Sequence, residues 1–134
     1  MRSLVVAAFL VGAVTPASAE SPIEQFCNNV LINYVTCSLE QQIINLGGVP
    51  PAPKSGKSCL PNYEGNVRPS YDAVINSVKG KPESTAMTKD VYALFLTSTR
   101  NLMPKSDERK IVYEARVNKA RDDIALACER LKLE

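Results

Sequence analysis

Histidine is absent from the sequence, and its absence excludes several kinds of catalytic and metal site. Ser-His-Asp and Cys-His catalysis both depend on an imidazole base, and the commonest zinc sites use imidazole as a ligand. The carboxylates are scattered, without a spacing that marks an acid and base pair. Residues 54–58 resemble the end of a phosphate-binding loop, but Pro51 stands where that motif requires glycine. We therefore expect a protein that is not an enzyme and holds no cofactor or metal.

A strong excess of positive charge is also missing. The chain has 16 Lys and Arg residues against 14 Asp and Glu residues, which is a net charge of +2. Proteins that bind nucleic acids normally carry a basic excess, because their affinity for phosphate comes largely from counterion release. We therefore expect no nucleic-acid partner.

A long apolar run is missing as well, since the first one, residues 4–14, has only 11 residues. A membrane-spanning helix needs about 20 residues, so stable membrane insertion is not expected. The run follows Arg2 and precedes a small-x-small pattern that ends at Ala19, a combination typical of a cleavable export signal. This predicts a signal peptide of residues 1–19 and a mature periplasmic protein of residues 20–134, long enough for one domain.

Four cysteines are present, and an even number in an exported protein indicates disulfides. No Cys-x-x-Cys motif occurs and no histidine is available to activate a thiol, so a redox role is not expected. Cys27 and Cys37 lie about 15 Å apart along one predicted helix, too far for a disulfide, whose Cα atoms lie within roughly 7 Å. Two pairings remain. If the first and last helices pack antiparallel, a bond between Cys27 and Cys128 lets both helices start and end together. This favours Cys27–Cys128 with Cys37–Cys59 over a pairing of Cys37 with Cys128.

Residues 22–46 predict a long helix that begins after the cap Ser21 and ends at two glycines. One apolar stripe of this helix is expected to face the core. A second apolar strip consists of Ile32, Val35, Leu39, Ile43 and Leu46, and the main polar edge consists of Asn29, Asn33, Thr36 and Glu40. A helix this widely apolar is buried on two sides, so we expect it at the centre of the domain. The alternative is that the second strip is a face on which two copies associate as a homodimer.

The rest of the chain predicts three further helices and no convincing strand or repeat, hence a small all-α domain of four helices. The second helix is expected after Ser70 and the fourth after Ser106. The third is expected to begin at Thr85 or Thr88. Residues 47–69 carry five prolines and four glycines, which predicts a long loop without regular structure after the first helix.

This loop is expected to contact a protein partner. Its prolines and a disulfide at Cys59 restrict the unbound loop, so ordering it against a partner costs less entropy. The candidate contact residues combine positive charge with apolar surface, and they are Lys54, Lys57, Leu60, Tyr63 and Arg68. Tyr63 is the expected anchor, because exposed aromatic residues concentrate binding energy. The alternative is that Leu60 and Tyr63 pack the loop onto the helices.

Part of the chain resembles a known family. Residues 59–61 read Cys-Leu-Pro and are followed by a predicted helix, a Lys-Pro-Glu turn at residues 81–83, and an Ala-Leu helix that ends at Pro104. This layout resembles the amidase-immunity (Rap/Tai) family of type VI secretion. The sequence departs from the family pattern at Lys105, where the family has a closing cysteine, and at Lys81, where its turn usually has histidine.

The resemblance implies a small exported helical protein with disulfides that protects a bacterium from a cell-wall amidase delivered by a neighbouring cell. Members of that family often act as dimers that insert a loop into the active-site cleft of the enzyme. The function expected is therefore that of an exported, non-catalytic binding or inhibitor protein whose partner is a secreted amidase toxin. The alternative is a periplasmic chaperone of acid stress, in which only the 14 carboxylates could respond to pH.

Overall fold

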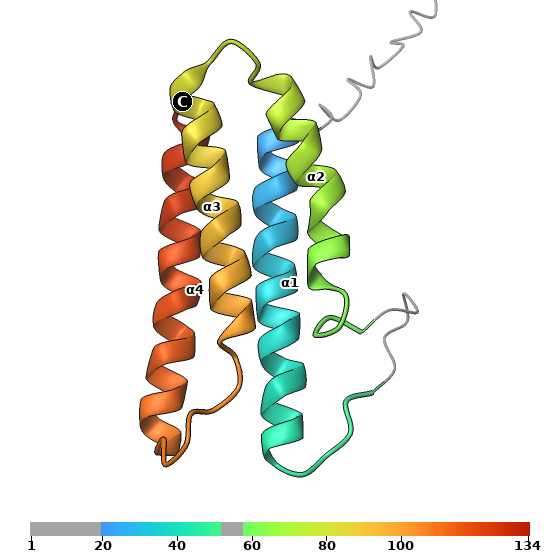
Figure 1. The fold of residues 1–134 in the computed structure, drawn as a ribbon, viewed down its shortest axis with the longest axis vertical. Coiled ribbons are helices and arrows are strands. Elements are labelled where there is room, and N and C mark those ends of the chain that lie inside the picture. Colours follow the sequence, from blue (N-terminus) through green and yellow to red (C-terminus); the bar gives the residue numbers. More distant parts are fainter. Residues whose placement is uncertain (1–19, 52–57) are drawn as a thin grey trace, which may run out of the picture.

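The computed structural model describes residues 20–51 and 58–134, which form a four-helix bundle (Figure 1). The helices are α1 (Pro22–Asn45), α2 (Tyr63–Ser77), α3 (Pro82–Arg100) and α4 (Lys110–Lys132). Successive helices run in opposite directions, and α1 contacts the three others, whereas α2 and α4 do not touch. The described residues form no strand, so the prediction of an all-α four-helix domain is confirmed. The predicted signal peptide, residues 1–19, lies outside the described residues.

One core holds the bundle together, and every helix contributes side chains to it. Its largest fully buried side chains are Tyr34, Phe26, Phe95, Leu102, Ile124 and Leu131. The buried Tyr34 hydroxyl donates to the Val117 carbonyl at 2.9 Å, so a hydrogen bond joins α1 to α4 inside the core. Tyr71 of α2 stacks on Tyr92 of α3, with ring centroids 4.2 Å apart. None of the described helices is long and apolar enough to cross a membrane.

Two disulfides join segments that are far apart in the sequence, and both have the predicted pairing. Cys27 of α1 is bonded to Cys128 of α4, with Cα atoms 5.7 Å apart. Cys37 of α1 is bonded to Cys59 near the end of the first loop, with Cα atoms 5.0 Å apart. No cysteine in the described part of the chain is free. Disulfides persist in oxidising compartments, which is consistent with the expected export of the protein.

The second helix begins earlier than the sequence predicts, so the loop expected over residues 47–69 is shorter. α2 starts at Tyr63 and continues through Pro69. Pro69 lacks the N–H that would bond the Gly65 carbonyl, but both residues are exposed, so water can satisfy that carbonyl. Val67, between them, is fully buried in the core, and this burial favours the helix over an open loop. The prediction was wrong here because tertiary burial outweighs the local cost of proline and glycine.

Two other helix starts also differ from the prediction. α3 begins at Pro82 rather than at one of the threonines that follow, because proline suits the first position of a helix. α4 begins at Lys110 rather than after Ser106. Asp107 has a φ of 60°, a left-handed conformation that a right-handed helix excludes. The segment before α4 is therefore a turn, closed by the Glu108 N–H, which donates at 3.0 Å to the carbonyl three residues earlier.

The apolar and polar sides of α1 face in unexpected directions. The sequence predicts that the second apolar strip is buried at the centre of the domain, but α2 and α4 flank α1 and leave this side open. Four of the five residues are exposed and one is half-buried, and we call the set the outer strip: Ile32, Val35, Leu39, Ile43 and Leu46. The prediction of a buried strip was therefore wrong for the single chain.

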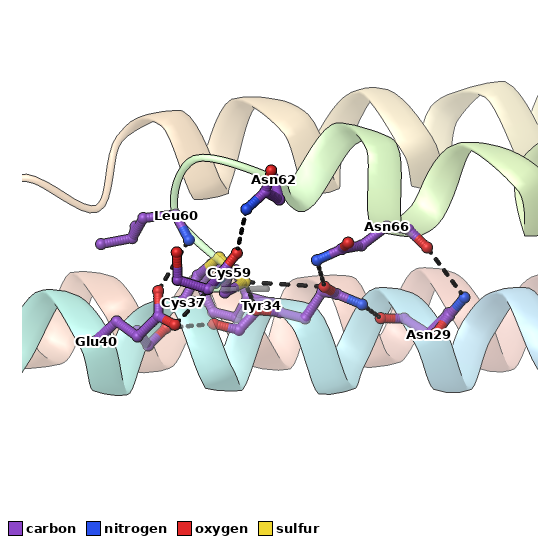
Figure 2. The surroundings of a disulfide bond; sticks show 11 residues. Asn29, Tyr34, Cys37, Glu40, Cys59, Leu60, Asn62 and Asn66 are labelled. Atoms are coloured by element: carbon purple, nitrogen blue, oxygen red, sulfur yellow. Dashed lines mark hydrogen bonds between the residues drawn. A yellow bond between two sulfur atoms is a disulfide. The ribbon is translucent and has the colours of Figure 1, made fainter. Parts of the chain in front are cut away.

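Much of the polar edge of α1 packs against α2 instead. The Asn66 amide of α2 donates to the Asn33 side-chain oxygen at 3.2 Å, and the Asn33 amide donates to the Asn29 carbonyl at 2.8 Å. The Asn29 amide in turn donates to the Ser70 hydroxyl at 3.2 Å (Figure 2 labels Asn29 and Asn66). These bonds satisfy polar groups that are half-buried between the two helices, which removes most of the cost of burying them.

Candidate binding surface

The end of the bundle farthest from the two ends of the described chain is built mainly from α1 and α4 (Figure 1). These helices have 24 and 23 residues, whereas α2 and α3 have 15 and 19. Since each residue adds about 1.5 Å, α1 and α4 extend beyond the shorter helices. The loop after α1 and the loop between α3 and α4 complete this region, which we call the distal end.

The distal end contains a cavity of about 320 Å³ between the last turns of α1 and the first turns of α4. Its apolar walls come from Leu46, Pro104 and Tyr113. Its polar and charged lining residues are Gln42, Asn45, Glu108, Lys110 and Glu114. A cavity of this size lies at the lower end of the range for ligand pockets, and its mixture of apolar walls and a charged rim is typical of binding sites.

Large apolar side chains are exposed at this end of the molecule, and one of them, Leu46, lines the cavity. Leu46 and Val49, at the start of the first loop, are 83% and 89% exposed. Met103 and Ile111, which flank the start of α4, are also exposed. Single exposed apolar residues are common, but four large ones at one end of the molecule, one of which lines a cavity, indicate a site for a partner. We call these four the distal apolar residues.

Arg116 holds the loop between α3 and α4 in position. Its guanidinium makes two hydrogen bonds to the Glu108 carboxylate, at 2.8 and 2.9 Å, and donates to the carbonyls of Asn101 and Met103. The Glu108 carboxylate also accepts the Lys105 N–H at 3.1 Å. The hydrogen bonds from Arg116, and then the one from the Lys105 N–H, lower the pKa of Glu108 to about 2. Glu108 is therefore ionised at neutral pH, and its ion pair with Arg116 orders the loop that carries Met103.

Glu40 anchors the other end of the first loop (Figure 2). Its two carboxylate oxygens accept the N–H groups of Cys59 and Leu60 at 2.8 and 2.9 Å. The Glu40 side chain is buried, and these two bonds to a charged acceptor offset the loss of its hydration. Together with the disulfide from Cys37 to Cys59, Glu40 fixes the end of the first loop to α1.

The structure separates the five partner-contact residues predicted from the sequence. Lys54 and Lys57 lie outside the described residues. Leu60 and Tyr63 are half-buried against the core, and the Tyr63 ring meets the Phe95 ring edge to face at 5.9 Å. Arg68 is exposed on α2, where it pairs with Asp72 at 3.0 Å and lies over the Tyr71 ring. Leu60 and Tyr63 therefore have the packing role that the sequence left as an alternative, and contact with a partner stays a prediction.

The sequence did not single out Val49, Met103 or Ile111. Val49 lies between a glycine and a proline, Met103 precedes Pro104, and Ile111 lies in the first turn of α4. Large apolar residues beside a glycine, a proline or a helix start belong to no periodic stripe, so hydrophobic periodicity does not identify them. Their position at these points is itself the signal that could have found them.

No family model, curated protein or solved structure matches this chain. The resemblance to amidase-immunity proteins therefore rests on the sequence motifs alone. Among residues 20–51 and 58–134, no group of three His, Cys, Asp or Glu side chains is placed so that it could hold a metal ion. The distal end is the part of the described chain that best combines a cavity with exposed apolar residues.

Proposed function

We propose that this protein is an exported, non-catalytic inhibitor that binds a protein partner through its distal end. The observation that carries the proposal is the exposure of the distal apolar residues at the end of the bundle that also holds the cavity of about 320 Å³, which Leu46 lines. Arg116 anchors the loop that carries Met103, and a disulfide and Glu40 anchor the far end of the first loop to α1. A surface already held in one conformation loses less entropy when it binds, so its apolar contacts contribute more fully to affinity.

The partner in this proposal is a cell-wall amidase delivered by a neighbouring bacterium. The support for this class of partner is the resemblance of residues 59–104 to amidase-immunity proteins. Such an enzyme would act on peptidoglycan in the periplasm, and the two disulfides suit a protein that works in that oxidising space. Protection would come from blocking the active-site cleft of the enzyme, which requires no catalytic group in the inhibitor.

The test is to co-express the protein with secreted amidases encoded beside its gene and to measure both cell survival and binding. Val49→Glu and Met103→Glu should lose protection and weaken binding by at least about 30-fold, because each would desolvate a charge in the contact. Leu126→Glu is the matched control, since Leu126 is an exposed apolar residue of α4 outside the distal end. It should protect like the native sequence.

Two outcomes would contradict parts of this proposal. If the native protein binds none of these amidases, the immunity function is wrong. If Val49→Glu and Met103→Glu stay folded by circular dichroism and protect fully, the distal end is not the contact surface. In that case Lys57→Glu would test the remaining prediction that the first loop makes the contact.

A second candidate function is that of a chaperone under acid stress, and the depressed pKa of Glu108 is the observation that favours it. Protonation of Glu108 near pH 2 would break its ion pair with Arg116, loosen the loop between α3 and α4, and expose more apolar surface at the distal end. The purified protein should then suppress aggregation of an unfolded client at pH 2 and not at pH 7. Equal activity at both pH values, or none, would exclude this function.

A further inference from the structure

The outer strip of α1 is a second apolar surface, on the side of the bundle rather than at its end. Ile32 and Leu39 are 63% and 55% exposed, and Val35 is also exposed. A shallow groove runs beside the strip, between α1 and α4, and it has a volume of about 100 Å³. Val35 and Leu39 line it from α1, and Asn118 and Arg121 line it from α4. The described chain therefore has an unpartnered helix face with a groove along one side.

The polarity of α1 is the opposite of that expected for a surface helix of a monomer. Asn29 and Asn33 form hydrogen bonds to α2, and Glu40 accepts hydrogen bonds from the end of the first loop. Isoleucine, valine and leucine side chains face solvent in their place. A monomer would gain free energy from the reverse arrangement, since apolar burial is the main favourable contribution to folding. The arrangement is explained if the outer strip is also buried, in an assembly.

The distribution of charge on α1 indicates which kind of partner could cover the outer strip. The helix contains two charged residues, Glu24 in its first turn and Glu40, which is buried on the side of α2. The outer face from residue 25 to residue 46 therefore carries no charge, and a charged partner would find no complement on it. Two identical faces of this kind can meet without like-charge repulsion. Arg121, at the rim of the groove, has the Asp122 carboxylate beside it at 3.5 Å.

The spacing of the strip also fits a symmetric helix pair. Ile32, Leu39 and Leu46 recur every seven residues, and Val35 and Gln42 recur with the same period. This is the pattern by which two helices interlock along a seam. Gln42 is the one polar residue in this pattern, and its amide both donates and accepts, so it can pair with its counterpart across a two-fold axis.

We propose that a second copy of this chain packs against the outer strip, so that the protein is a two-fold symmetric dimer joined through α1. The seam extends from Ile32 to Leu46, about 21 Å of helix. The groove beside α4 accepts side chains from the second copy. Gln42 and Leu46, at one end of the seam, also line the distal cavity, so the dimer shares this part of the cavity wall. The rest of the wall, which includes Pro104, Lys110 and Tyr113, lies outside the seam.

Sedimentation of the mature, oxidised protein over a range of concentrations tests this dimer. The native protein should show a concentration-dependent dimer, and Ile32→Glu or Leu39→Glu should weaken it by at least tenfold, because the glutamate would be buried without a counter-charge. Leu126→Glu is the matched control, since Leu126 is 51% exposed and lies outside the strip and the groove. It should dimerise like the native protein. A native protein that is monomeric at every concentration, or a Leu39→Glu variant that dimerises as tightly as native, would overturn the proposal.

A measurement on the native sequence covers the case in which the glutamate variants fail to fold. Methyl NMR signals of Ile32 and Leu39 should shift as the protein is diluted, and the signal of Leu126 should not. Signals of the strip that do not change while the protein dissociates would show that the interface lies elsewhere. None of these variants changes Val49 or Met103, so failure of the dimer can be told apart from failure of the proposed function.

Discussion

Two carboxylates, the buried Glu40 and the partly buried Glu108, position the loops of this protein. Each accepts hydrogen bonds from donors fixed by the fold, two backbone N–H groups at Glu40 and the Arg116 guanidinium at Glu108. These bonds offset the loss of hydration that burial of a charge would otherwise bring. In the sequence both residues resemble ordinary surface acids, and only their three-dimensional neighbours give them a structural role.

The ion pair of Glu108 predicts a specific dependence of stability on pH. The pKa of Glu108 is about 2 in the folded protein, below the value of about 4.3 expected for the unfolded chain. A lowered pKa means that folding favours the ionised form, so its contribution is fully present above about pH 4.3 and is lost as the pH falls toward 2. We expect the stability difference between native protein and Glu108→Gln to be constant above pH 5 and to shrink below it. Urea denaturation from pH 2 to pH 6 measures this difference.

The comparison with Glu108→Gln cancels the titration of the other carboxylates, which both proteins share. Arg116→Ala provides a second test, because it removes the partner that lowers the pKa of Glu108. It should remove most of the same pH-dependent component, while the bond from the Lys105 N–H remains. A difference between native protein and Glu108→Gln that does not vary with pH would show that the ion pair does not stabilise the folded state.

At the scale of the elements, α2 shows how packing overrules local preference. The helix contains Gly65 and Pro69, both unfavourable in a helix interior, yet it forms because Val67 and Val74 are fully buried in the core. α1 shows the same effect in its orientation, since contacts with α2 and α4 determine which of its sides faces solvent. Local propensity therefore predicts that these helices exist better than it predicts where they begin or which way they face.

The glycine in α2 offers a test at this scale. Gly65 lies in helical backbone, and a Cβ added there would meet nothing within 4 Å. Gly65→Ala should therefore raise the free energy of unfolding by about 0.5–1 kcal/mol. Gly80→Ala is the matched control: its surroundings are equally open, but its φ of 84° disfavours alanine, so it should lower stability. Thermal or urea denaturation gives both values, and a destabilising Gly65→Ala would contradict the helical assignment of this segment.

At the scale of the whole molecule, the two disulfides act over very different chain lengths. Cys27–Cys128 joins residues 101 positions apart and links the first helix to the last, whereas Cys37–Cys59 spans 22 positions. A long closed loop restricts the unfolded chain more than a short one. The pairs are also alike in burial, since all four cysteines lie in the core. Their contributions to stability can therefore be compared directly.

We expect removal of Cys27–Cys128 by a double alanine substitution to cost about 4–5 kcal/mol, and removal of Cys37–Cys59 to cost about 3 kcal/mol. The difference follows from the chain entropy of the unfolded state. Denaturation of the two variants, with the remaining disulfide verified by mass spectrometry, measures both values. A larger loss from the shorter loop would mean that anchoring the first loop matters more than restricting the unfolded chain.

The sequence predicted the candidate site less completely than it predicted the fold. The first loop, residues 47–69, was predicted to be the contact region, and of the distal apolar residues it supplies only Val49. Met103 and the anchoring pair of Glu108 and Arg116 come from the other end of the chain. No pattern in the sequence connects these two segments, because they meet only when α1 and α4 pack side by side.

Local patterns in the sequence were enough to predict the all-α class and the four helices, and to exclude a disulfide between Cys27 and Cys37. These follow from the repeat of about 3.6 residues per turn and from distances along a helix, both of which are local properties of the chain. The sequence did not predict that the outer strip of α1 faces solvent, that α2 begins at Tyr63, or that Glu108 orders a loop. These features depend on contacts between residues far apart in the sequence, whose burial and hydrogen bonds outweigh the smaller preferences of each segment alone.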